Sequence, residues 1–202
     1  LTHHGQLIFK RDPIQGLEYL GTPVTAKDET TALKTMVDRG EIHPAIQQVS
    51  DFLQRMAVFE EPDLFSLRMQ GSPAFDDQQL HGRGQNVLSV LRRWQQEKQF
   101  KHRFDFVLQG LQAAFPKLTD IDFDGAGNVL TARVYHQGVE HPAPLAHEAN
   151  GVLQMLVLLA NVAQADPGGV VAIDEPENGL HPYAMRMFLR GCQQWALKYQ
   201  VT

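Results

Sequence analysis

Two adjacent carboxylates, Asp174 and Glu175, follow directly after the apolar run Val170–Ile173. An aspartate at the end of a strand can hold a magnesium ion directly or through water. The second carboxylate of such a pair can orient the water that attacks a phosphate, or accept its proton. Because side chains alternate along a strand, we expect the two carboxylates to point in opposite directions. The pair is therefore a candidate for phosphate chemistry, with Asp174 able to hold a metal ion and Glu175 able to activate water, although many buried strands also end in an acidic residue.

The apolar run before this pair is typical of a parallel strand that is buried on both faces. In open α/β sheets, ligands bind outside the carboxyl ends of the strands, where both carboxylates would lie. An Asn178-Gly179 turn follows, and Pro182 then starts a helix that runs to about residue 199. We expect that helix to bury Met185, Phe188, Cys192, Trp195 and Tyr199.

The rest of the chain must supply the sheet and the helices that position these residues. Hydrophobic periodicity, caps and prolines predict helices over residues 25–38, 44–57, 85–97, 104–115 and 151–165, the last of them buried because it is apolar nearly all round. Short strands are predicted over residues 6–10 and 16–20, and a hairpin joins residues 121–124 to 129–136. Residues 60–84 are predicted to be a loop-rich excursion, because Pro and Gly interrupt every pattern there.

Composition narrows the class of protein. The 202 residues are 43% hydrophobic and 20% charged, which indicates a globular protein with a real core. A single cysteine excludes an intrachain disulfide and favours a cytoplasmic location.

The longest apolar run, residues 152–163, is too short to span a bilayer, so we expect no membrane association. The chain starts without Met and ends on residues that could begin a strand, so we expect it to be a fragment.

The net charge of −5 argues against a globally basic nucleic-acid binder. Residues 83–103 nevertheless form a basic stretch with interleaved aromatic side chains. Contact with DNA or RNA through phosphate neutralisation and stacking is one interpretation of this stretch. A solvated helical face is the other interpretation.

The run Asp-Glu-Pro-Glu-Asn-Gly-Leu-His-Pro over residues 174–182 resembles the Walker B and D-loop of ABC-type ATPase heads. It is most similar to bacterial AAA-family ATPases related to the OLD, RecF and SMC proteins. Residues 147–151, His-Glu-Ala-Asn-Gly, resemble the signature segment of that family, and an apolar helix follows them. The pieces at residues 84–91 and 111–116 are also similar, so the resemblance covers about residues 80–202.

This resemblance implies the cofactors and the site. It implies an α/β fold that is part of a P-loop NTPase, which binds ATP and Mg²⁺ and closes as a homodimer around the nucleotide. Asn150 and Gly151 would contact the phosphate bound by the partner head, since a helix N-terminus binds anions well. Asn178, Gly179, Leu180 and His181 would form the D-loop at the dimer interface; capping of the following helix is the structural alternative for His181.

Two departures from the family pattern matter. Ala149 stands where the signature has a serine, which removes a hydroxyl group that would bond the γ-phosphate. No Gly-x-x-x-x-Gly-Lys-Ser/Thr occurs in the chain, so the Walker A phosphate loop is missing from it, as is the switch histidine. The chain by itself should therefore neither bind ATP tightly nor hydrolyse it.

The sequence thus predicts three parts: a remnant of an N-terminal lobe (residues 1–40), an inserted helical and β-hairpin region (41–140), and the signature, Walker B and D-loop part of an ATPase core (141–202). The predicted function is an ATP-hydrolysing head that dimerises on ATP and powers or gates an activity on nucleic acid, of the DNA-repair or anti-phage type. A nuclease or other effector would be its partner. The alternative is a degenerate, non-hydrolysing head that acts as a regulatory or scaffold module. A transporter-associated ATPase fits less well, because Asn-Gly-Leu-His replaces the Ser-Ala-Leu-Asp-like loop of transporters.

Overall fold

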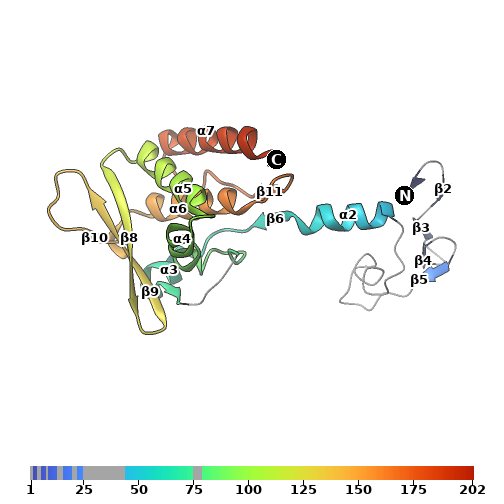
Figure 1. Ribbon diagram of the computed structural model, residues 1–202, viewed down its shortest axis with the longest axis horizontal. Helices are drawn as coiled ribbons and strands as arrows, with labels where there is room; N and C mark the ends of the chain where they lie inside the picture. The colour runs from blue at the N-terminus through green and yellow to red at the C-terminus, as the bar shows by residue number, and fades with distance from the viewer. Residues whose placement is uncertain are drawn as a thin grey trace. The chain divides into compact units, whose positions relative to one another are not determined.

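The computed structural model describes residues 44–74 and 79–202, together with the backbone of short strands among residues 2–24. The chain divides into two compact units, residues 1–55 and residues 56–202 (Figure 1). The three-part division predicted from the sequence stays a prediction.

The described residues of the first unit form five short strands and one helix. Strands β1 (Thr2–His3) and β2 (Gln6–Leu7) form an antiparallel pair. Strands β3 (Phe9–Asp12), β4 (Gly16–Tyr19) and β5 (Thr22–Val24) form a three-stranded antiparallel sheet in chain order, which confirms extended structure at both predicted positions. The predicted helix over residues 25–38 lies outside the described residues. Helix α2 spans Pro44–Gln54 and begins at the predicted proline.

The predicted continuation of this helix through Met56 and Ala57 is wrong. These residues open strand β6 (Met56–Phe59), which pairs in parallel with the strand before the carboxylate pair. The apolar positions continued the helical spacing, but the same residues also suit a strand. The neighbouring strand, more than 100 residues away in the sequence, offers them hydrogen bonds that a local pattern cannot show.

The prediction that residues 60–84 are mostly loop is also wrong in part. Helix α3 (Leu64–Gln70) begins after Asp63, whose carboxylate accepts hydrogen bonds from the backbone N–H of Ser66 at 3.0 Å and its hydroxyl at 2.8 Å. This side-chain cap supports a helix that is too short to show a clear period. Strand β7 (Ser72–Pro73) follows, and residues 75–78 lie outside the described part.

An antiparallel sheet forms around the predicted hairpin, which is confirmed and is longer than expected. Strands β8 (Leu118–Ala126) and β9 (Val129–His136) pair along their length. Strand β7 pairs with the start of β9, and strand β10 (Ala143–Pro144) pairs with β9 at Arg133 and Val134. Successive residues of β9 alternate between exposed and buried positions, with Leu130, Ala132 and Val134 buried, as expected for a sheet with one covered face.

Four helices build the core of the second unit, as the periodicity predicted. They are α4 (Val87–Gln96), α5 (Lys101–Ala114), α6 (Asn150–Gln164) and α7 (Pro182–Tyr199), and a short 3₁₀ helix η1 (Leu145–His147) precedes α6. Helices α5, α6 and α7 pack side by side (Figure 1). All residues of α6 from Val152 to Ala163 are buried, which confirms its predicted central position. In α7, Phe188 and Trp195 are buried, whereas Met185, Cys192 and Tyr199 are half-buried against the core.

Strand β11 (Val170–Ile173) forms at the predicted position and pairs in parallel with β6. The prediction that it is buried on both faces is wrong for the described structure. Val171 and Ile173 pack against the core, but Ala172 is exposed and its neighbour on β6, Val58, is 65% exposed. On the other side of β11, the backbone of Thr202 bonds to Gly169 and Val171 in the pattern of a parallel strand. One face of this small sheet is therefore open within the part of the chain that the structure describes.

Candidate functional site

The carboxylate pair lies at the carboxyl end of β11, where the sequence placed it. Strand β11 ends at Ile173, and the side chains of Asp174 and Glu175 are both exposed. Among the described residues, neither side chain forms a hydrogen bond or an ion pair. Two exposed carboxylates without protein partners are available to a cation or to water.

The backbone at Glu175 departs from the strand. Its φ is +43°, in the left-handed region that residues other than glycine seldom adopt. Because β11 ends at Ile173, strand alternation does not set the direction of the Glu175 side chain relative to Asp174 in the way expected from the sequence. Strain of this kind costs of the order of 1–3 kcal/mol and concentrates at functional sites.

The D-loop segment, residues 178–181, follows in two tight turns. The backbone N–H of Asn178 donates to Glu175 O at 3.0 Å, and that of Leu180 donates to Glu177 O at 3.0 Å. His181 is the N-cap of α7, and its Nδ1 accepts from the N–H of Tyr183 at 3.2 Å. This bond confirms the helix-capping interpretation of His181 and leaves its predicted contact with nucleotide as a prediction.

The signature segment, residues 147–151, leads into the N-terminus of α6. Ala149 is the N-cap and offers no side-chain bond to the first N–H groups of the helix, which begins at Asn150. A Cβ atom placed on Gly151 would lie 3.5 Å from the carbonyl oxygen of Gly179 and 4.0 Å from Cδ2 of Leu180. The structure thus brings the signature and D-loop segments of one chain together at the uncapped end of a buried helix.

The described contacts do not join Asp174 or Glu175 to Asn150. Within the described residues there is also no cluster of three or more His, Cys, Asp or Glu side chains that could hold a metal ion. A magnesium ion at Asp174 would therefore need water and substrate oxygens as its other ligands, which is the usual coordination of Mg²⁺ at phosphates.

Two further contacts hold the signature segment and were not found from the sequence. Arg68 on α3 donates from Nη2 to the carbonyl oxygen of Glu148 at 2.8 Å and to Asn150 Oδ1 at 2.7 Å, and from Nη1 to the carbonyl oxygen of Ala146. His136 on β9 bonds through Nε2 to Glu148 Oε1 at 2.8 Å. No local pattern could show the Arg68 contacts, because these residues lie 78 to 82 positions apart in the sequence.

Intramolecular contacts occupy much of the basic stretch. Arg93 pairs with Glu97 at 2.6 Å, and Lys101 pairs with Asp105 at 3.1 Å. Arg103 donates to the carboxylate of Asp166 at 2.8 Å and to the carbonyl oxygen of residue 164 at 3.1 Å. These pairs favour the structural interpretation for Arg93, Lys101 and Arg103.

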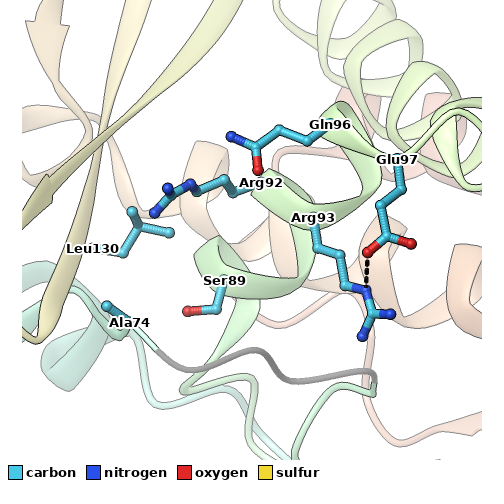
Figure 2. Close-up of a pocket in the computed structure, with 7 residues that line it drawn as sticks. All are labelled: Ala74, Ser89, Arg92, Arg93, Gln96, Glu97 and Leu130. Carbon is cyan, nitrogen blue, oxygen red and sulfur yellow. Dashed lines mark hydrogen bonds and ion pairs between the residues drawn. The ribbon is translucent and has the colours of Figure 1, made fainter.

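A shallow cavity of about 230 Å³ lies against α4 in this basic stretch. Figure 2 shows Ser89, Arg92, Arg93, Gln96 and Glu97 along one side of the helix, with Ala74 and Leu130 opposite. Arg93 and Glu97 engage each other there, so the exposed Arg92 is the cation that the cavity presents most openly.

The single cysteine, Cys192, packs against the core from α7. Burial raises the pKa of the Cys192 thiol to about 12. The thiolate is the reactive form of cysteine, so this side chain remains a thiol that packs in the core at neutral pH.

Mixed α/β architecture, with parallel strands that end in a carboxylate pair and an antiparallel sheet beside them, is consistent with an AAA-type domain. A family profile described as "AAA domain, putative AbiEii toxin, Type IV TA system" matches residues 38–192. The matched span covers most of the chain, and the chain belongs to this family. No curated protein and no solved structure gives a match. Among the described residues, no helix combines the length and the apolar character needed to cross a membrane.

Proposed function

We propose that this chain forms the signature, Walker B and D-loop side of an ATPase head that closes on a second head around ATP. One observation carries the proposal. In a chain that belongs to an AAA-domain family, the uncapped N-terminus of α6 lies against Gly179, four residues beyond the exposed carboxylate Glu175. Free N–H groups at a helix N-terminus suit a nucleotide phosphate, and exposed carboxylates at the end of a strand suit a metal ion.

In this proposal each residue has a distinct role. Asp174 holds Mg²⁺ directly or through water, and the ion when bound neutralises charge on the phosphates. Glu175 orients the attacking water or accepts its proton. Asn150 and Gly151 donate to the phosphate bound by the partner head, and the absence of a side chain at Gly151 allows that phosphate to approach the backbone closely.

The D-loop residues Asn178, Gly179 and His181 lie at the interface of the two heads in this proposal. This placement is supported by the contact between the D-loop and the signature segment, because Gly151 at the start of α6 lies close to Gly179 and Leu180. The matching family is described as a putative AbiEii toxin of a type IV TA system. It is in keeping with a defence role in which the head gates an effector that acts on nucleic acid.

Substitution of Glu175 by Gln in the full-length protein tests the proposal. We expect ATP turnover to fall by a factor of about 10² or more, because Gln cannot accept the proton. ATP-dependent dimerisation should persist or tighten, since nucleotide remains bound. Glu177→Gln is the matched control, because it removes the neighbouring carboxylate of the same loop. Steady-state hydrolysis at the unsubstituted rate in the Glu175→Gln protein contradicts the assignment.

A non-hydrolysing scaffold is the second candidate, and Ala149 favours it. The serine hydroxyl that the signature normally offers to the γ-phosphate is absent at this position. The coding sequence upstream of Leu1 separates the two functions. A Gly-x-x-x-x-Gly-Lys-Ser/Thr there supports the ATPase, and its absence supports the scaffold.

A further inference from the structure

The guanidinium group of Arg68 joins α3 to the signature segment and to Ala146, the residue before it, through three acceptors. Its Nη1 bonds to the carbonyl oxygen of Ala146, and its Nη2 bonds to that of Glu148 at 2.8 Å and to Asn150 Oδ1 at 2.7 Å. A planar group with donors in a fixed fork holds such a segment in one geometry, which a lysine with its single ammonium group cannot reproduce.

The bond to Asn150 decides which end of its carboxamide faces outward. A carboxamide has an oxygen that accepts hydrogen bonds and an NH₂ group that donates them. Because Arg68 binds the oxygen, the NH₂ group of the exposed Asn150 is left for another partner. Within the described residues, this NH₂ group forms no hydrogen bond. Phosphate oxygens accept hydrogen bonds, so the group that remains is the one that an anion requires.

The positive charge of Arg68 also favours an anion at the start of α6. All three of its acceptors are neutral, and among the described residues no carboxylate lies within ion-pair distance of it. The carboxylate of Glu148, on the same segment, is bound instead to His136 at 2.8 Å, with only 11% of its side chain exposed. The positive charge of Arg68 therefore adds to the positive end of the α6 dipole.

We infer that Arg68 is a positioning residue that turns Asn150 so that its side-chain NH₂ replaces the missing serine hydroxyl as the phosphate donor of the signature segment. The inference rests on the function proposed above. Asn150 immediately follows Ala149, where the serine is lacking, and it begins the helix whose first N–H groups have no side-chain cap. A donor lost at one position of the segment is thus supplied by the next.

The test measures the ATP concentration that gives half-maximal dimerisation of the full-length protein, with Glu175→Gln present in every sample to prevent turnover. Asn150→Asp keeps the side chain's shape and its bond to Arg68, but replaces the NH₂ group with an oxygen. We expect it to raise the half-maximal ATP concentration by about tenfold or more, the size of a hydrogen bond to a charged group. Arg68→Ala should raise it in the same direction. Lys101→Ala is the matched control, because Lys101 pairs with Asp105 on α5 near the C-terminal end of α6, the end opposite the signature segment.

A double-substitution cycle distinguishes positioning from general support of the fold. If Arg68 acts through Asn150, Arg68→Ala should raise the half-maximal ATP concentration by a smaller factor in the Asn150→Ala protein than in the protein that retains Asn150. Thermal unfolding of each variant shows whether the protein is still folded. Asn150 is exposed, so its substitutions test the inference even where Arg68→Ala unfolds the protein.

The outcomes separate this inference from the proposed function. No dimerisation with ATP in the Glu175→Gln protein overturns the proposed function, and this inference falls with it. A normal ATP response together with an unchanged half-maximal concentration in Asn150→Asp overturns the inference alone. Fully additive effects of Arg68→Ala and Asn150→Ala overturn the positioning role.

Discussion

Among single residues, Glu175 combines an unfavourable backbone with the carboxylate assigned to water activation. Its φ of +43° puts its Cβ close to the following carbonyl oxygen, which for most side chains costs about 1–2 kcal/mol. Asparagine tolerates this conformation far better than glutamate does. A glutamate in this strained conformation is in keeping with the catalytic role proposed above for its carboxylate.

Glu175→Asn should accordingly stabilise the protein while it removes the carboxylate. We expect the free energy of unfolding in urea to rise by about 1 kcal/mol, because Asn adopts the left-handed region readily. Glu175→Gln is the control, since it removes the same charge but keeps the strained backbone and should leave stability unchanged. Equal stability of the two variants would show that the backbone at this position is not strained.

The sequence predicts those parts of the site in which the contacting residues lie close together along the chain. The positions of Asp174 and Glu175 after a strand, and of His181 at the start of a helix, follow from neighbours within a few residues. The bonds of Arg68 to the signature segment join residues 78 or more positions apart, and nothing in the composition of α3 marks Arg68. Such contacts depend on how the elements pack, so only the structure could find them.

At the level of elements, strong local signals predicted the structure and weak ones did not. Helices α4 to α7 and the β8–β9 hairpin have long periodic patterns, so their existence was predicted correctly. Helix α3 has seven residues and was missed, because a cap at Asp63 defines it and no full period does. Strand β6 was read as helix, because its pairing with β11 is a contact between distant parts of the chain.

Contacts between helices also give one cation of the basic stretch, Arg103, a structural role. Arg103 on α5 bonds to the end of α6 and to Asp166, and its guanidinium lies over the rings of Trp94 and Phe100, at 5.7 Å and 5.4 Å from their centroids. Its side chain is only 14% exposed. A cation in this position links α4, α5 and the turn before β11, and it has little surface to offer to a nucleic acid.

Arg103→Ala should therefore lower stability without a specific effect on nucleic-acid binding. We expect a loss of about 1–3 kcal/mol in the free energy of unfolding, from the lost hydrogen bonds and ring contacts. Arg92→Ala on the exposed side of α4 is the control and should change stability by less than about 0.5 kcal/mol. The measurements are urea unfolding and DNA binding at two salt concentrations. Weaker DNA binding by Arg103→Ala at unchanged stability would instead favour the nucleic-acid interpretation.

On the scale of the whole second unit, the site depends on how closely three helices pack. The N-termini of α6 and α7 carry the signature and D-loop segments, and α5 contacts both helices. Glycines lie at both contacts: Gly110 of α5 against Leu159 of α6, and Gly191 of α7 against Phe106 of α5. The absence of a side chain at Gly110 lets α5 and α6 approach closely, whereas Gly191 leaves room for a Cβ atom between α5 and α7.

The two glycines should respond in opposite ways to alanine, although both lie inside helices. A Cβ atom at Gly110 would lie 2.6 Å and 2.8 Å from the two methyl carbons of the fully buried Leu159. At Gly191 the nearest atoms, on the ring of Phe106, are 3.6 Å away, an ordinary contact. Gly191→Ala should therefore gain the helix propensity of alanine, about 0.5–1 kcal/mol. Gly110→Ala should instead lose on the order of 1–2 kcal/mol, because overpacking outweighs that gain.

Urea unfolding of both variants measures this difference, and a second substitution identifies its cause. In a Leu159→Ala background the methyl groups that oppose Gly110 are gone, so adding Gly110→Ala should be neutral or stabilising. A Gly110→Ala protein as stable as Gly191→Ala would mean that the α5–α6 contact is loose. The proximity of Gly151 to Gly179 would then not be fixed by helix packing, and contacts made directly by the two loops, including those of Arg68, would have to hold the site together.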